Sequence, residues 1–182
     1  MEVQSTKFEG LLLLTPRAFK DERGVFRETW SRRAFAEATG LDVEFVQDNE
    51  SRSGAGVLRG LHFQVPPHAQ GKLVCCAAGR VLDVAVDLRT ASPTFGQHLR
   101  VELSAANGMQ LWIPPGFAHG FVSLEPDSVL HYKCTSGYAP GAEGALRWDD
   151  ADLGIDWGVD APLISPKDAD AGRWADFESP FR

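Results

Sequence analysis

Short runs of alternating apolar and polar residues follow one another along most of the chain, separated by glycine and proline. In the clearest run, RVLDVAVDLR (80–89), the aliphatic residues at even positions share one face of a strand, while Asp83 and Asp87 share the other. The same reasoning predicts further strands at FEGLLLL (8–14), GVFRETW (24–30), VEFVQDN (43–49), GQHLRVELS (96–104), MQLWIPP (109–115), HGFVSLE (119–125) and SVLHYKC (128–134).

One helix stands out, at SRRAFAEATG, where Ser31 is suited to cap the N-terminus and Gly40 to stop the helix. Many short strands with little helix predict an all-β fold, a jelly-roll β-barrel or sandwich with a few short helices. No repeat or linker divides the chain, so residues 1–182 are expected to form a single domain. After residue 147 we expect a tail of acidic loops and short helical turns that closes one end of the barrel or covers its edge.

The composition limits the partners and the compartment. The 182 residues carry a net charge of −7, which argues against a nucleic acid or an anionic membrane as the main partner. A local cluster of cations can still bind an anionic small molecule. The three cysteines, of which Cys75 and Cys76 are adjacent, cannot all pair, so reduced thiols and a cytoplasmic protein are expected. The four leucines near the N-terminus are too few for a signal peptide or a membrane span.

Polar residues interrupt the strand-like stretch GVLRGLHFQVPPHAQGKLV (56–74). His62 and Lys72 lie there among residues suited to burial, so they are either surface residues or point into a working cavity. Farther along, PPGFAHG has the spacing P-x-G-x-x-H that ends at His119 and resembles the second motif of the cupin superfamily. The first cupin motif supplies H-x-H and then a glutamate as metal ligands, but here Gln64 replaces the second histidine and Lys72 replaces the glutamate. Because a lysine cation repels a divalent metal, no metal or other cofactor is expected.

A histidine, a lysine and a tyrosine in one cavity can invert a carbon centre beside a ketone. The imidazole removes the proton, and an ammonium stabilises the enolate oxygen that results. A tyrosine hydroxyl can then return a proton to the opposite face. The chain has only two tyrosines, Tyr132 and Tyr138, as candidates. A carboxylate that orients the histidine would complete the unit.

Several motifs, in order, resemble dTDP-4-dehydrorhamnose 3,5-epimerases. The resemblance runs from about Phe8 to Asp168 and implies a metal-free, cupin-type jelly-roll homodimer. Its substrate would be a dTDP-linked 4-keto-6-deoxy sugar in L-rhamnose synthesis, and an N-terminal arm would reach toward the partner subunit. The motifs are QDNES, GVLRGLHFQ, QGKLV, GRVLDVAVDLR, PPGFAHGF, SGYAPGAEGALRWDD and SPKDAD.

The resemblance also implies roles for individual residues. His62 is similar to the general base, Tyr132 to the general acid and Lys72 to the enolate stabiliser. Asp168 is similar to the residue that orients His62, and Tyr138 to the tyrosine that stacks on thymine. The other implied contacts to the nucleotide sugar are Arg59 and His119 near the sugar and phosphates, then Arg23, Glu28, Gln47, Asn49, Glu143 and Lys167, with Phe19 and Phe26 as candidates to cover the base.

Simpler interpretations stand beside these roles. His62 also fits a satisfied core histidine, Tyr132 fits barrel packing, and Asp168 fits a helix cap. Strand alternation places Arg59 and His62 on opposite faces, unless a bulge at Gly60 turns both toward one cavity.

Three other functions fit much the same residues. One is an epimerase that inverts only C3 or C5 of a related deoxysugar nucleotide. Another is a metal-dependent cupin oxygenase or isomerase. The third is a catalytically silent protein that binds sugar nucleotides.

Overall fold

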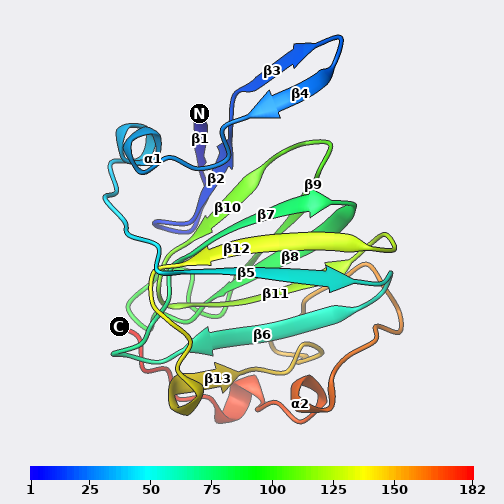
Figure 1. The fold of residues 1–182 in the computed structure, drawn as a ribbon. Coiled ribbons are helices and arrows are strands. Elements are labelled where there is room, and N and C mark those ends of the chain that lie inside the picture. The colour runs from blue at the N-terminus through cyan, green and yellow to red at the C-terminus, as the bar shows by residue number, and fades with distance from the viewer.

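Two antiparallel sheets lie face to face in the computed structural model, which describes residues 1–182 (Figure 1). This arrangement confirms the predicted all-β sandwich, and the sheets do not close into a continuous barrel. The six-stranded sheet has the order β1 (Glu2–Ser5), β2 (Leu12–Thr15), β10 (Gln110–Ile113), β7 (Lys72–Ala78), β12 (Ser128–Cys134) and β5 (Gln47–Ser53). The five-stranded sheet has the order β13 (Glu143–Ala145), β6 (Leu58–Gln64), β11 (Phe117–Ser123), β8 (Arg80–Asp87) and β9 (His98–Ser104).

The remaining elements are short. The hairpin of β3 (Ala18–Asp21) and β4 (Gly24–Arg27) projects from the body of the sandwich (Figure 1). The helical elements are α1 (Arg32–Thr39), α2 (Pro166–Ala169) and the 3₁₀ turns η1 (Pro140–Ala142) and η2 (Trp174–Asp176). None of these helices has the length and apolar character needed to cross a membrane.

Helix α1 forms as its sequence predicts. The Ser31 side chain accepts a hydrogen bond from the backbone of Ala34, and Gly40 ends the helix with a left-handed φ of 74°. Its buried face places Phe35 against Leu73 and Trp112 on the outer face of the six-stranded sheet. The helix therefore covers part of that outer face.

Two predicted strands begin four residues later than expected. The segment 8–11 is a turn, because the Thr6 hydroxyl bonds to the backbone of Phe8 and Leu11. These two apolar side chains are buried in the core from that turn. Residues 43–46 are also outside a strand, and β5 starts at Gln47. Hydrophobicity alone predicted the burial of Phe8 and Leu11 but not the backbone conformation, and Val46 is exposed.

Strand β8 is buried on both faces. Val81 and Ala85 belong to the core between the sheets, whereas Val84 and Val86 pack on the other side of the five-stranded sheet. Asp83 and Asp87 share the register of Val81 and Ala85, so they point into the sandwich, and neither is exposed.

The C-terminal tail lies along an edge of the sandwich, as expected, and also covers a face. At the edge, Leu163 pairs with Val57 just before β6. Leu153, Trp157 and Phe181 pack against apolar residues of β6, β8 and β11. Those strands carry apolar side chains on their outer surface as well, and burying that surface from water favours docking of the tail.

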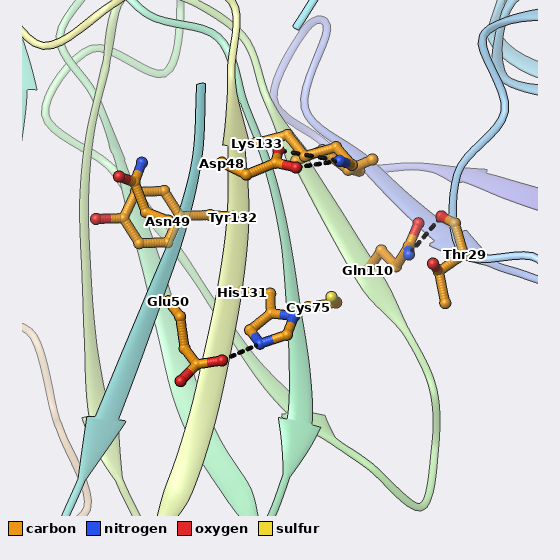
Figure 2. Close-up of a pocket in the computed structure, with 10 residues that line it drawn as sticks. Thr29, Asp48, Asn49, Glu50, Cys75, Gln110, His131, Tyr132 and Lys133 are labelled. Atoms are coloured by element: carbon orange, nitrogen blue, oxygen red, sulfur yellow. Dashed lines mark hydrogen bonds and ion pairs between the residues drawn. The ribbon is translucent and has the colours of Figure 1, made fainter. Parts of the chain in front are cut away.

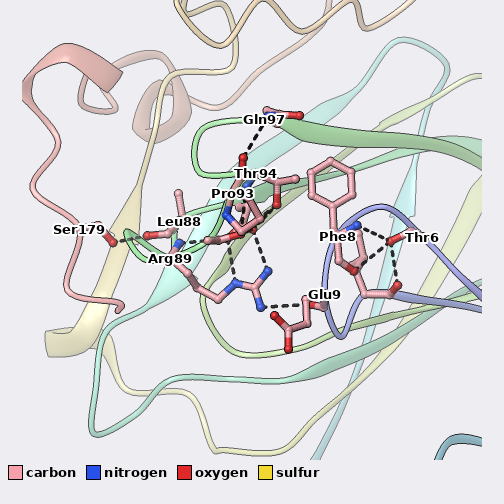
Figure 3. Close-up of polar contacts among 12 residues, drawn as sticks. Thr6, Phe8, Glu9, Leu88, Arg89, Pro93, Thr94, Gln97 and Ser179 are labelled. Atoms are coloured by element: carbon pink, nitrogen blue, oxygen red, sulfur yellow. Dashed lines mark hydrogen bonds and ion pairs between the residues drawn. The ribbon is translucent and has the colours of Figure 1, made fainter.

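A cluster of polar contacts around Arg89 lies where β8 ends (Figure 3). The Asp87 carboxylate accepts hydrogen bonds from Arg89 Nε at 2.9 Å, Ser92 Oγ at 2.6 Å and Thr94 Oγ1 at 2.7 Å. Arg89 also donates to the backbone carbonyl of Glu9, at 3.0 Å. The cluster thereby ties the N-terminal segment to the loop that follows β8.

Candidate active site

Two adjoining hollows lie on the side of the sandwich formed by β5, β6 and β12, and they meet at His62, Lys72 and Tyr132. The larger, of about 590 Å³, is also lined by Arg59 and His119. The smaller, of about 260 Å³, shares the same three side chains. Its other lining residues include Gln47, Asn49, Tyr138 and Glu143. The residues expected at the reacting sugar and several of those expected at the nucleotide therefore border adjoining hollows.

His62 is paired with Asp168 across a tertiary contact. The His62 Nε2 atom lies 2.6 Å from Asp168 Oδ1, and the carboxylate side chain is only 4% exposed. Asp168 belongs to α2. Ser165 caps this helix, because its hydroxyl accepts a hydrogen bond from the backbone N–H of Asp168. The helix cap thus holds a buried carboxylate against an imidazole. Asp168 is not only a helix-capping residue, because its side chain bonds to His62.

The Lys72 ammonium is buried at the start of β7, opposite Cys134 on β12. Burial lowers the pKa of Lys72, while the nearby Cys134 and Asp83 act in the opposite direction. This burial excludes the interpretation of Lys72 as a solvated surface residue. It is well placed to face a developing negative charge in the cavity.

Tyr132 lies on the inner side of β12, which rules out an outward surface position. Figure 2 shows the ring of Tyr132 and the amide of Asn49 on the opposite side of the strands from His131 and Lys133. Burial raises the pKa of the Tyr132 hydroxyl, so it keeps its proton to a higher pH than an exposed tyrosine.

His119 brings in a carboxylate that the sequence analysis did not select. Its Nε2 atom lies 2.9 and 3.0 Å from the two oxygens of Asp83, which is fully buried. The available signal was the pair of aspartates on one face of RVLDVAVDLR. Without knowing that this face turns inward, that pattern equally fits a solvent-exposed face.

Arg59 and His62 face the same cavity because β6 has a bulge. His62 pairs with His119 and Arg59 with Phe121, so three steps along β6 match two along β11. Gly60 lies in the bulge, where a Cβ atom would approach the Cα of Gly120 to 2.5 Å. Only glycine fits that close approach. The bulge at Gly60, which strand alternation requires if Arg59 and His62 are to face one cavity, is present.

Polar contacts join the residues around the smaller hollow. The Tyr138 hydroxyl donates to Glu143 at 2.8 Å, and Lys167 Nζ lies 2.6 Å from the same carboxylate. Burial raises the pKa of Glu143, but hydrogen bonds from Lys167 and Tyr138 outweigh it and the net pKa is lowered. The Gln47 amide donates to Asn49 at 2.9 Å.

Four of the residues expected at the nucleotide lie away from the cavity of their own chain. None of them lines either hollow. The β3–β4 hairpin points outward (Figure 1), with Phe26 68% exposed and Arg23 bonded to Asp21 beside it. These four residues are Phe19, Arg23, Phe26 and Glu28.

The cavity does not have the donor set of a metal-binding cupin. No cluster of three or more histidine, cysteine or acidic side chains suited to a metal occurs in the chain. The Gln64 amide is engaged by three backbone groups. Lys72 brings a cation to the position of the missing glutamate, and His68 is exposed in its turn.

A separate hollow of about 350 Å³ lies on the outer face of the six-stranded sheet (Figure 2). Its wall carries the ion pairs Asp48–Lys133, at 2.9 Å, and Glu50–His131, at 2.8 Å. Gln110 Nε2 donates to the carbonyl of Thr29 at 2.8 Å. Because its charges pair with one another, this hollow lacks the free cations that a diphosphate requires.

A β-sandwich cavity with a carboxylate-paired histidine, a buried amine and a phenol has the groups of an acid–base enzyme that moves protons at carbon. Comparison with known proteins gives the class. The family model of dTDP-4-dehydrorhamnose 3,5-epimerase matches residues 5–176. The enzyme of that name from Shigella flexneri is 49% identical over 97% of each chain. Its counterpart from Pseudomonas aeruginosa is 54% identical over 91% of this chain and 92% of its own.

A solved structure agrees over nearly the whole fold. The crystal structure of dTDP-6-deoxy-D-glucose-3,5-epimerase from Legionella pneumophila, in complex with dTDP-4-keto-L-rhamnose, superposes with a TM-score of 0.90. The two sequences are 46% identical over 94% of this chain and 91% of the other. The protein is thus an isomerase on a cupin-like jelly roll. It belongs to the dTDP-4-dehydrorhamnose 3,5-epimerase family, as its motifs predict.

Proposed function

We propose that this enzyme inverts C3 and C5 of dTDP-4-dehydro-6-deoxy-D-glucose to give dTDP-4-dehydro-L-rhamnose, in dTDP-L-rhamnose synthesis. The family membership supports the substrate and the reaction. The observation that carries the mechanism is the meeting of His62, Lys72 and Tyr132 where the two hollows join.

The base and the acid come from opposite walls. His62 is on β6 of the five-stranded sheet, whereas Tyr132 is on β12 of the six-stranded sheet. A sugar ring held between the sheets would present one face to each. His62 takes the proton from the carbon beside the C4 ketone, and the electron pair moves to the ketone oxygen as an enolate. Tyr132 then returns a proton to the opposite face, which inverts the centre.

Other charged groups support these steps. Asp168 orients the His62 ring and stabilises its protonated form. Lys72 donates to the enolate oxygen, and a preorganised cation in a site of low dielectric constant is effective there. Arg59 and His119 lie toward the sugar and phosphates, while Lys167, Glu143, Gln47, Asn49 and Tyr138 border the nucleotide.

Deuterium incorporation tests the reaction. The protein is incubated with the substrate in deuterated water, and the product is analysed by NMR. Label at both C3 and C5 is expected, because each inversion replaces one carbon-bound hydrogen with a solvent deuteron. Label at one carbon would instead identify a single-centre epimerase. Full activity after chelation is the expected result that separates this mechanism from a metal-dependent one.

We further propose that the protein acts as a homodimer whose β3–β4 hairpin enters the partner's cavity. The support is the outward course of the hairpin and the exposure of Phe19 and Phe26 on it (Figure 1). Arg23, Glu28 and these two aromatic rings would then contact the nucleotide bound in the partner subunit. An arginine there suits a diphosphate.

Subunit mixing tests the exchange. Chains with Arg23→Ala and chains with His62→Ala are each expected to have low activity. In a mixed dimer, the intact His62 of one chain would meet the intact Arg23 of the other, so activity should return. Mixing without recovery, after subunit exchange has been verified by mass, would place the hairpin outside the partner's site.

A further inference from the structure

Gln64 stands where a metal-binding cupin would carry its second histidine, and the proposed reaction gives it no role. It lies two residues after His62 on β6 and is only 4% exposed. Its Nε2 atom donates to the carbonyls of His68, at 2.8 Å, and Gly137, at 3.1 Å. Its Oε1 atom accepts from the backbone N–H of Ala139, at 2.8 Å. The side chain is therefore committed to the backbone.

The surroundings of Gln64 fix the orientation of its amide. Two carbonyl oxygens face one end and an N–H group faces the other, so only one orientation makes all three hydrogen bonds. A glutamate would place an oxygen acceptor against two carbonyl oxygens. The site thus selects an amide over a carboxylate of the same shape.

Two more glutamines hold the same loop. Gln47 Oε1 accepts from the backbone N–H of Tyr138, at 2.8 Å, and Gln70 Nε2 donates to the carbonyl of Ser136, at 2.7 Å. Gln47 begins β5 of one sheet, Gln64 ends β6 of the other, and Gln70 precedes β7. Residues 136–139 are therefore fixed by side chains from three separate segments.

We infer that Gln47, Gln64 and Gln70 are positioning residues that hold the loop 136–139 as a preformed platform for the nucleobase. The inference rests on the proposed function, in which Tyr138 contacts the base. The Tyr138 side chain is tied to Glu143 through its hydroxyl, yet the residue is 57% exposed. Its backbone and its hydroxyl are both anchored, which leaves the ring available for stacking. Binding then does not need to order the loop, and that ordering cost is removed from the affinity.

The substitution Gln64→Glu tests the platform. We expect the Kd for dTDP, measured by calorimetry, to rise about tenfold or more, because two hydrogen bonds are lost and replaced by repulsion. KM should rise with it, while kcat at saturating substrate stays within about threefold, a split that damage to the acid–base groups would not produce. Gln97→Glu is the matched control: Gln97 is exposed and accepts from Lys7, which can bind a carboxylate equally well. An unchanged Kd in Gln64→Glu would overturn the inference.

A double-mutant cycle separates positioning from direct contact. If Gln64 acts through Tyr138, the effect of Gln64→Glu on the Kd should shrink below about twofold in a Tyr138→Ala background. If the full effect persists there, Gln64 touches the nucleotide itself and the positioning role is wrong. Gln70→Glu, which loses one bond, is expected to weaken dTDP binding less than Gln64→Glu does.

Amide hydrogen exchange tests the platform without any assay of activity. In the unliganded protein, the N–H groups of Tyr138 and Ala139 should already be protected, because Gln47 and Gln64 accept from them. Gln64→Glu should speed exchange at Ala139. Free exchange of both amides before nucleotide is added would contradict a preformed loop. Protection without epimerase activity would leave the platform standing and count against the proposed reaction instead.

Discussion

Asp83 and Asp87 both point from β8 into the sandwich, four residues apart and fully buried, yet they lie in different kinds of surroundings. Asp87 accepts hydrogen bonds from Arg89, Ser92 and Thr94 in the polar cluster around Arg89 (Figure 3), and Arg89 also donates to the backbone carbonyl of Glu9. Asp83 instead holds His119, whose ring borders the cavity beside Lys72.

The difference shows what separates a structural charge from a functional one in this fold. In the polar cluster around Arg89, opposite charges and hydroxyl groups satisfy one another. Beside the cavity, the carboxylates of Asp83 and Asp168 lie behind histidines, and the histidines and Lys72 face about 590 Å³ of space. Burial alone does not mark a catalytic group; burial beside a cavity with unused hydrogen-bonding capacity does.

The largest effect should come from removing the proposed base, His62, from the cavity. His62→Ala is expected to lower kcat by about 10²–10⁴ and to abolish deuterium exchange into the substrate. The dTDP affinity should change little, whereas the thermal midpoint should fall, because the buried Asp168 carboxylate loses its partner. NMR in deuterated water measures the exchange, and calorimetry measures the dTDP affinity and the thermal midpoint. Exchange at the wild-type rate would refute the role of His62.

Lys72→Met should separate chemistry from stability. We expect kcat to fall by about 10²–10³ through loss of the group that stabilises the enolate. The free energy of unfolding should stay equal or increase, because a buried ammonium loses its hydration on folding. Kinetics and urea denaturation provide the measurements. A large loss of stability would instead make Lys72 a structural residue like Arg89.

Asp87→Asn, in the polar cluster around Arg89, should lower stability and leave activity almost unchanged. Loss of the charged hydrogen bonds is expected to lower the free energy of unfolding by about 2–3 kcal/mol, with kcat within about twofold of wild type. Burial raises the pKa of Asp87, but Arg89 and the two hydroxyl groups outweigh it, so the net pKa is lowered. The stabilisation is therefore present above the pKa of an unfolded aspartate and lost as pH falls through the lower folded value.

Denaturation of Asp87→Asn across the acid range tests this linkage. The variant should lose stability less steeply than wild type as the pH is lowered. Asp152→Asn, at an exposed position, is the control and should differ by less than about 0.5 kcal/mol. If Asp87→Asn loses stability as steeply as wild type when the pH is lowered, other carboxylates are responsible for that loss.

The smallest effect is a shift of the alkaline limb of the kcat/KM profile to lower pH. Because burial lowers the pKa of Lys72, kcat/KM should decline with rising pH through a value below that of an ordinary lysine. Burial raises the pKa of Tyr132, so its ionisation should follow at higher pH. The limb is expected to disappear in Lys72→Met and to persist in Tyr132→Phe. A limb that moves with Tyr132→Phe would reverse the assignment.

The sequence predicted most strands and the helix cap because their signals are local. Alternation identified β8, β9 and β12, and Ser31 and Gly40 marked the limits of α1. The prediction was wrong where apolar residues were buried without forming a strand, as at Phe8 and Leu11, whose conformation depends on hydrogen bonds from Thr6. The sequence also missed that the tail covers a face as well as an edge, since alternation did not reveal that a second face of β8 needed cover.

By itself, the sequence determined the family and the chemical groups, because motifs and residue types are properties of the chain. Only the tertiary structure decided which groups meet. It paired His62 with Asp168 over 106 positions, selected Asp83 for His119, and held residues 136–139 with three glutamines. These contacts join strands of two sheets and a distant helix. Their geometry is set by register and packing, which no local pattern of residues encodes.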